Sequence, residues 1–185
     1  MRITGGIARG KQIKSPRSSF TRPLLSRIRK SLFDVLGEKI KGSGFLDLYA
    51  GSGAVGIEAL SRGAKRVVFV EKNTACVRMI KENLFLCGFY SFSTIWQKDV
   101  LSFLPLLLEE EKFDFIFVAP PYYKNLQNRT LDILEEKDSG KAELIVQYSP
   151  KEKFNFSRKN IKIGREKRYG DTILAFLSQT NFHRW

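Results

Sequence analysis

Cysteine and histidine are almost absent from this chain. Its 185 residues include two cysteines, Cys76 and Cys87, and one histidine, His183. Neither cysteine lies at a ligand spacing, so the sequence predicts neither a disulfide framework nor a zinc site, and we expect both cysteines to serve packing. The prediction for metals is therefore none.

Long apolar runs are missing as well. No stretch approaches the roughly 20 apolar residues that a membrane helix needs, and residues 1–6 lack the apolar segment of a signal peptide. We expect a cytoplasmic protein without a membrane partner. The composition, with 43% hydrophobic and 28% charged residues, excludes disorder as the main state. A chain of this length suits one domain, or one domain with an appendage.

Acidic residues are scarce, above all at the two ends. The chain has 32 Lys and Arg against 19 Asp and Glu, a formal net charge of +13. Residues 1–41 contain 11 basic and 2 acidic side chains, residues 42–150 contain 12 and 14, and residues 151–185 contain 9 and 3. This asymmetry favours binding to a nucleic acid over the alternative, a cationic surface that only aids solubility.

Apolar runs alternate with helical patterns along the neutral middle. The runs predict buried strands at residues 45–49, 66–70, 92–96, 113–118 and 144–147, and the helical patterns fill residues 54–62, 73–87, 100–110 and 125–137. The alternation predicts an α/β fold with an open, doubly wound, parallel sheet. Two more strands, at 161–164 and 172–177, are expected to form an antiparallel hairpin that closes one sheet edge.

The first 41 residues have a different character. Short strands at 2–6 and 11–14 flank a glycine-rich turn, a Pro/Ser/Arg segment follows, and Ser26 is expected to cap a helix. We therefore divide the chain into a basic arm with a helix, residues 1–41, which contacts nucleic acid, and a main domain, residues 42–185.

A glycine motif follows the first predicted strand of the sheet. Gly51, Gly53 and Gly56 satisfy G-x-G-x-x-G between a strand and a helix, where the backbone turns tightly and approaches a ligand. The motif fits a dinucleotide, and it equally fits S-adenosylmethionine. Glu71, twenty positions after Gly51, can accept hydrogen bonds from ribose hydroxyls in either case.

Asp47 favours the methyl donor. It precedes the glycine turn, where it would face the cationic amino-acid end of S-adenosylmethionine and would repel a dinucleotide phosphate. Asp99 is placed to accept the adenine amine beside the apolar Val100, although it can also serve as the N-cap of the helix at 100–110. Tyr49 and Lys72 complete the predicted cofactor-binding set.

The strand at 113–118 ends in a proline motif, Ala119-Pro120-Pro121-Tyr122. Two prolines make a rigid turn at the carboxyl end of a strand, which is where ligands bind in open α/β sheets. Tyr122 offers a stacking face for a base, and the alternative for it is a core tyrosine at a strand end.

These motifs together resemble a known enzyme class. Asp47-x-x-x-Gly51-x-Gly53 with Pro120-Pro121-Tyr122 resembles class I methyltransferases of exocyclic amines, whose pattern is Asp/Asn-Pro-Pro-aromatic. The motifs within 2–11, 21–33 and 168–174 are similar to those of the RsmD family, the bacterial 16S ribosomal RNA guanine-N2 methyltransferases that act on guanine 966.

The resemblance covers nearly the whole chain and carries specific expectations. It implies a Rossmann-like, seven-stranded methyltransferase sheet with an antiparallel last strand and a small amino-terminal β-hairpin. It implies S-adenosylmethionine as cofactor and 16S rRNA within an assembling small ribosomal subunit as partner, and we expect a monomer. The catalytic positions are Ala119, Pro120, Pro121 and Tyr122. The arm residues expected to hold RNA phosphates are Arg2, Arg9, Lys11, Arg22, Arg27 and Arg29.

Ala119 departs from the family pattern, which has Asp or Asn at this position. An acceptor there and the carbonyl of the next proline hold the two N–H groups of the amine. Loss of one charge-assisted hydrogen bond costs about 1.5–3 kcal/mol, on the order of ten- to a few-hundredfold in rate. We therefore expect weakened activity.

Three alternatives remain at this stage. The protein could be an RNA-binding or assembly protein that kept the fold and lost the chemistry, as Ala119 permits. It could be an amino-methyltransferase of another RNA or DNA target, although a separate target-recognition region has little room in 185 residues. A dinucleotide oxidoreductase is compatible with the glycine motif alone.

Overall fold

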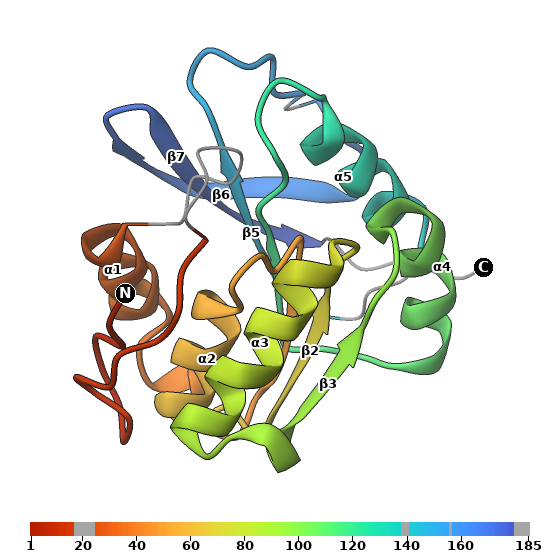
Figure 1. The fold of residues 1–185 in the computed structure, drawn as a ribbon. Coiled ribbons are helices and arrows are strands. Elements are labelled where there is room, and N and C mark those ends of the chain that lie inside the picture. Colours follow the sequence, from red (N-terminus) through yellow and green to blue (C-terminus); the bar gives the residue numbers. More distant parts are fainter. Residues whose placement is uncertain (17–24, 138–140, 156, 180–185) are drawn as a thin grey trace.

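The fold is an α/β sandwich around one seven-stranded sheet, seen in a computed structural model that describes residues 1–16, 25–137, 141–155 and 157–179 (Figure 1). The strand order is β3-β2-β1-β4-β5-β7-β6. The strands are β1 (Gly44–Leu48), β2 (Arg66–Val70), β3 (Ser93–Trp96), β4 (Phe115–Val118), β5 (Glu143–Tyr148), β6 (Ile161–Tyr169) and β7 (Thr172–Gln179). Strands β1 to β5 are parallel, and β7 is antiparallel to both β5 and β6. The predicted fold class is confirmed.

Helices cover both faces of the sheet (Figure 1). The helices are α1 (Ser26–Leu36), α2 (Ala54–Ser61), α3 (Thr74–Cys87), α4 (Val100–Glu110) and α5 (Leu126–Glu136), with short 3-10 turns η1 (Gly37–Ile40) and η2 (Tyr90–Phe92). Helices α1, α2 and α3 share one buried cluster with one face of the sheet, and α4 and α5 share a second cluster with the other. Among the described residues, no helix is long and apolar enough to cross a membrane.

The two clusters follow from the strand period. Phe45 points to the side of α1–α3 and Leu46 to the side of α4 and α5, and Phe115 and Ile116 repeat this alternation. Because helices cover both faces, every position of β4 is buried and apolar. This is why unbroken apolar runs predicted the central strands well.

The amino-terminal arm is a hairpin of minimal length. Its ladder is a single bridge between Arg2 and Gln12, where the sequence predicts two short strands. The arm is held instead by the helix layer: the Ala8 N–H donates to Ser61 Oγ at 2.9 Å, and the Thr4 N–H donates to Glu58. Donors that go to α2 are not available for a longer ladder.

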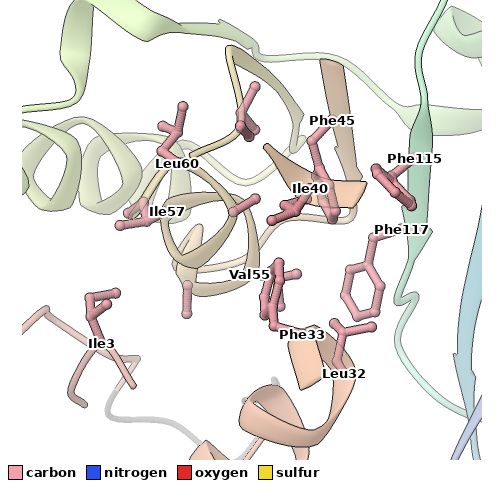
Figure 2. Packing of buried hydrophobic residues seen from close by; sticks show 14 of the residues in the cluster. Ile3, Leu32, Phe33, Ile40, Phe45, Val55, Ile57, Leu60, Phe115 and Phe117 are labelled. Carbon is pink, nitrogen blue, oxygen red and sulfur yellow. The ribbon is translucent and has the colours of Figure 1, made fainter. Parts of the chain in front are cut away.

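Residues of the arm and of α1 belong to the core under the sheet. Ile3 and Leu32 lie in the same buried cluster as Phe45 and Val55 (Figure 2). The functional division at residue 41 stays a prediction. At the start of α1 one detail differs from the expectation, because the N-cap position is Leu25 rather than Ser26 and makes no side-chain cap.

Candidate functional site

The candidate site lies at the carboxyl ends of β1, β2 and β4. From β1 the chain passes through α2 to β2 on one side, whereas β4 and β5 lie on the other side. In open α/β sheets the crevice outside the strand ends at such a switch point is the ligand-binding position. The glycine turn and the proline turn are both placed there, because they follow β1 and β4 directly.

The three glycines of the turn have three different environments. Gly51 and Gly53 have φ angles of 55° and 73°, in the left-handed region. A Cβ on Gly56 would lie 2.3 Å from Phe69 Cε1, so this glycine lets α2 pack closely on β2. A Cβ on Gly51 would meet no heavy atom within 4 Å. The space beside Gly51 is therefore open, as a turn that admits a ligand requires.

Asp47 joins the end of β1 to the first turn of α2. Its Oδ2 accepts the Gly56 N–H at 2.9 Å, and the residue is only 2% exposed. Burial raises the pKa of this carboxyl to about 8, although the Gly56 N–H opposes the shift and the Glu71 carboxylate adds to it. A cationic group brought next to Asp47 would favour its ionised form.

Glu71 ties the loop after β2 to the glycine turn. One carboxylate oxygen accepts the Gly51 N–H at 2.9 Å and the other accepts the Asn73 N–H at 2.8 Å. Each oxygen keeps acceptor capacity for a further donor. The structure thus joins Glu71 directly to the glycine turn, and the predicted contact of Glu71 with a ribose stays a prediction.

Asp99 is the N-cap of α4. Its Oδ1 accepts the Leu101 N–H at 3.0 Å, and Lys72 Nζ lies 3.4 Å from its Oδ2. The alternative role assigned to this residue, helix N-cap, is therefore confirmed. Oδ2 accepts from Lys72 and keeps acceptor capacity for a further donor. Val100 is buried, at 3% exposure, beside it.

Tyr49 stands at the end of β1 with a φ of 59°. Its hydroxyl makes a 2.8 Å hydrogen bond with Thr130 Oγ1 of α5. Burial raises the pKa of Tyr49 to about 12, so the phenol stays neutral. Thr130 is a supporting residue that the sequence reasoning did not identify.

The proline turn contacts β1 through its first residue and contacts β5 and β7 through Tyr122. The Ala119 N–H donates to the Leu48 carbonyl at 3.4 Å, which places the turn next to Tyr49. Tyr122 Oη accepts a hydrogen bond from Gln147 Nε2 at 3.0 Å and pairs with Thr172 Oγ1 at 3.1 Å.

The supports of Tyr122 come from distant segments. Gln147 lies on β5 and Thr172 on β7, and the sequence reasoning missed both. Gln147 was detectable in principle, because it is a single amide directly after the apolar run 144–146 of β5. With its hydroxyl held, the half-exposed Tyr122 ring has a fixed orientation beside the site.

The predicted RNA-binding residues fall into three groups. The side chains of Arg2, Arg9, Lys11 and Arg27 are exposed on the arm and at the start of α1. Arg22 lies outside the described residues.

Arg29 requires a correction. Its side chain is fully buried, its Nε lies 3.1 Å from Glu58 Oε2, and its guanidinium also donates to the Arg2 carbonyl. A guanidinium engaged in this way inside the protein does not contact RNA phosphates.

Comparison of the sequence with known proteins identifies its family. The sequence model of the family described as Conserved hypothetical protein 95 matches residues 1–178. The chain belongs to this family. It is 34% identical, over 79% of its length and 76% of the relative's, to ribosomal RNA small subunit methyltransferase D of Haemophilus influenzae. It is 33% identical to the protein of the same name from Escherichia coli K12, over 74% of this chain and 67% of that one.

Solved structures share the fold. A hypothetical protein of Thermus thermophilus superposes with a TM-score of 0.78 at 33% identity, covering 97% of this chain and 99% of the other. An RNA methyltransferase of Salinibacter ruber in complex with S-adenosyl-L-homocysteine superposes with a TM-score of 0.68 at 13% identity, over 88% and 97%, which shows the fold alone. The resemblance to the RsmD family is confirmed, and the fold is that of the family's methyltransferases.

Proposed function

We propose that this protein transfers a methyl group from S-adenosylmethionine to the N2 amine of guanine 966 in 16S rRNA. The observation that carries the proposal is the meeting of two turns at one sheet edge. The glycine turn after β1 adjoins the proline turn after β4 through the Ala119 to Leu48 hydrogen bond. The family relatives named ribosomal RNA small subunit methyltransferase D support the RNA substrate.

The residues present fit the methyl donor. The open space beside Gly51 leaves room for the ligand against the turn. Asp47 suits the cationic amino-acid end, Glu71 keeps acceptor capacity for ribose hydroxyls, and Asp99 presents an exposed carboxylate oxygen beside the buried Val100. When bound, S-adenosylmethionine supplies a methyl group activated by a sulfonium cation.

The proline turn would hold the amine. The Pro120 carbonyl can accept one N–H of guanine N2, and the fixed Tyr122 ring can stack on a base that has left the RNA helix. Held in this way, the nitrogen lone pair is directed at the methyl group, and positioning supplies most of the rate acceleration. The amine releases a proton after attack, so the site needs no strong base and no covalent intermediate.

Ala119 offers no acceptor for the second N–H. This observation favours a second candidate function, a ribosome-assembly protein that binds the same RNA and has lost the chemistry. The two candidates share the cofactor and RNA surfaces and differ in turnover. A protein with the missing acceptor should still act, at a rate lower by on the order of ten- to a few-hundredfold.

Methylation of small ribosomal subunits tests the proposal. Immature small subunits from a bacterium that lacks its own methyltransferase D are incubated with the protein and labelled S-adenosylmethionine, and the rRNA is digested to oligonucleotides that are sequenced by mass spectrometry. We expect N2-methylguanosine at position 966, formed slowly in single-turnover conditions. Glu71→Ala serves as the control that should lose cofactor affinity. Tight subunit binding without any methyl transfer would instead establish the assembly protein.

A further inference from the structure

Strand β6 carries a row of basic side chains that the proposed mechanism does not use. It is the last strand in the sheet order, and within the described residues its partner strand is β7. One acidic residue, Glu166, stands among four basic ones on this strand: Lys162, Arg165, Lys167 and Arg168. Lysine and arginine on an edge strand also discourage edge-to-edge aggregation, so charge alone does not assign a partner.

The register separates these charges by face. Arg165 lies opposite Phe176 and Lys167 lies opposite Leu174. Phe176 and Leu174 belong to the cluster beneath α1–α3, and directly opposed residues of an antiparallel pair share a face. The basic side chains at 165 and 167 are therefore on the α1 face.

Lys162 joins the same face and Glu166 is on the other. Lys162 lies opposite Ser178. Leu177 belongs to the cluster of α4 and α5, so its neighbour Ser178 is on the α1 face, and Lys162 shares that face. The bulge between residues 163 and 165 keeps Lys162 in phase with Arg165. Glu166 faces the other cluster and accepts a hydrogen bond from Tyr148 Oη. The α1 face of β6 thus presents three cations and no acid, a segregation that protection of a sheet edge does not require.

The tip of the β6–β7 hairpin connects this row to the proline turn. Tyr169, at the end of β6, pairs with Thr172 across the tip, and Thr172 Oγ1 lies 3.1 Å from Tyr122 Oη. On the other side Tyr169 Oη is hydrogen-bonded to Ser31 Oγ of α1. The hairpin and α1 lie on the same side of the molecule (Figure 1). A polyanion that leaves the proline turn therefore meets the basic row next.

We propose that the β6–β7 hairpin binds the RNA strand next to the target guanine, with Lys162, Arg165 and Lys167 contacting its phosphates. The inference rests on the proposed function, because it takes RNA as the substrate. A base drawn out of its helix needs its flanking backbone held, and contacts to phosphates set that position without reading sequence. In this proposal the amino-terminal arm and the hairpin contact the RNA backbone at two separate places.

A matched pair of double variants tests the hairpin. Arg165→Glu/Lys167→Glu reverses the row, and Lys65→Glu/Lys141→Glu makes the same charge change at exposed positions before β2 and β5, at the amino ends of the parallel strands. Binding of immature small subunits is measured over a range of salt concentrations. We expect the hairpin variant to bind at least about tenfold more weakly, with a salt slope smaller by about 1.4 for two lost single-strand contacts. The control variant should bind subunits as the wild-type protein does. Both variants should keep the cofactor affinity and the melting temperature of the wild-type protein.

A second measurement uses the wild-type protein and needs no variant to fold. Lysine acetylation followed by mass spectrometry, with and without subunits, should show protection of Lys162 and Lys167 and none of Lys65 and Lys141. Equal protection of all four lysines by the subunits, or equal subunit binding by the two double variants, would overturn the inference. A loss of affinity that is the same at every salt concentration would place a ribosomal protein there and would also overturn it.

These outcomes separate the inference from the proposed function. If the wild-type protein transfers no methyl group while reversal of the hairpin charges still weakens RNA binding, the hairpin assignment stands and the activity fails. If the wild-type protein methylates guanine and both double variants behave alike, the activity stands and the hairpin assignment fails.

Discussion

At position 119 a methyl group stands where the amine-methyltransferase pattern has an acceptor. The side chain is partly exposed, and its backbone is held to β1 by the hydrogen bond to Leu48. The rest of the site does not depend on this side chain, since Tyr122 is fixed by Gln147 and Thr172. A substitution at position 119 should therefore change turnover without changing the other contacts of the site.

Restoring the acceptor should raise the rate. We expect Ala119→Asp to increase single-turnover methylation of immature small subunits by on the order of ten- to a few-hundredfold, because the new hydrogen bond strengthens as the amine rehybridises. Cofactor and RNA affinities should change little. Ala119→Asn should give a gain in the same direction, and Ala119→Val, which adds volume without an acceptor, should give none. An unchanged rate in both polar variants would show that another group accepts the hydrogen bond from the second N–H, or that the protein has lost the chemistry.

Asp47 makes the protein sensitive to pH. Its folded pKa, about 8, is above the value of 3.8 for an unperturbed carboxyl, so the folded state holds the proton more tightly. The stabilisation that this group contributes is complete below pH 4 and is lost as the pH rises through 8. Asp47→Asn keeps the side chain neutral at every pH.

The variant and the wild-type protein should therefore diverge at high pH. We expect Asp47→Asn to gain stability relative to wild type between pH 5 and pH 9, by about 1–3 kcal/mol at the upper end. Its affinity for S-adenosylmethionine should fall, because the carboxylate that we propose to face the cationic end is gone. Thermal unfolding across the pH range and calorimetry at pH 8 measure the two effects. A constant stability difference would mean that Asp47 titrates in its ordinary range.

Among the elements, α2 and α3 hold the arm, α3 through Asn83 and α2 through Glu58. Glu58 of α2 is fully buried and receives hydrogen bonds from the Thr4 N–H at 2.9 Å, from Arg29 at 3.1 Å and from Arg62 at 3.0 Å. A buried carboxylate with this many donors is satisfied only when the arm and α1 are both in place. A buried carboxylate thus joins the arm to α1 and α2, in addition to the short backbone pairing within the arm.

Removal of this carboxylate should loosen the arm and α1 together. We expect Glu58→Ala to lower the free energy of unfolding by about 3–5 kcal/mol, because it leaves the buried Arg29 guanidinium without its partner. Lys30→Ala, which breaks the exposed Lys30–Asp34 pair, should cost about 0.5 kcal/mol or less. Urea denaturation of both variants measures the difference. Similar small losses would show that Arg29 is compensated by its other two hydrogen-bond acceptors, the Arg2 carbonyl and Met1 Sδ, alone.

For the whole molecule, the exposed basic residues are concentrated in the two ends of the chain. Ala8 and Lys11 of the arm contact Ser61 and Cys87, the last residues of α2 and α3, so this part of the arm lies away from the glycine turn that precedes α2. The arm carries the exposed Arg2, Arg9 and Lys11, and β6 carries its basic row beyond α1. The site itself is built from the nearly neutral middle of the chain. The residues that we propose for RNA binding and those that we propose for cofactor binding therefore lie on different segments, and each set can be changed separately.

Neutralising the arm should separate the two functions. We expect Arg9→Ala/Lys11→Ala to weaken subunit binding and to reduce its salt slope by about 1.4, since each lost single-strand phosphate contact contributes about 0.7. The affinity for S-adenosylmethionine should not change. Lys65→Ala/Lys141→Ala provides a control of equal charge. Equal loss of cofactor and RNA affinity in the arm variant would indicate a folding defect, because Lys11 also approaches the Cys87 carbonyl.

The central sheet and the glycine turn were readable from the sequence alone. Strand β2 and helix α4 have the predicted bounds, because strands buried on both faces must be apolar throughout and because Asp99 marks the helix start. The turn after β1 was predictable for a related reason: the left-handed backbone at Gly51 and Gly53 favours glycine, and the close packing of Gly56 on Phe69 leaves no room for a Cβ.

Tertiary structure alone decided the remaining features. Arg29 has the sequence context of an RNA-facing residue, and it is buried because Glu58, 29 positions later, lies opposite it. Tyr122 is held by groups 25 and 50 positions away. Strand β6 extends to Tyr169, well beyond the predicted 161–164, because an exposed edge strand needs no apolar alternation. Local patterns record local periods and turns, whereas burial of a charge and the orientation of a side chain depend on partners that only folding brings near.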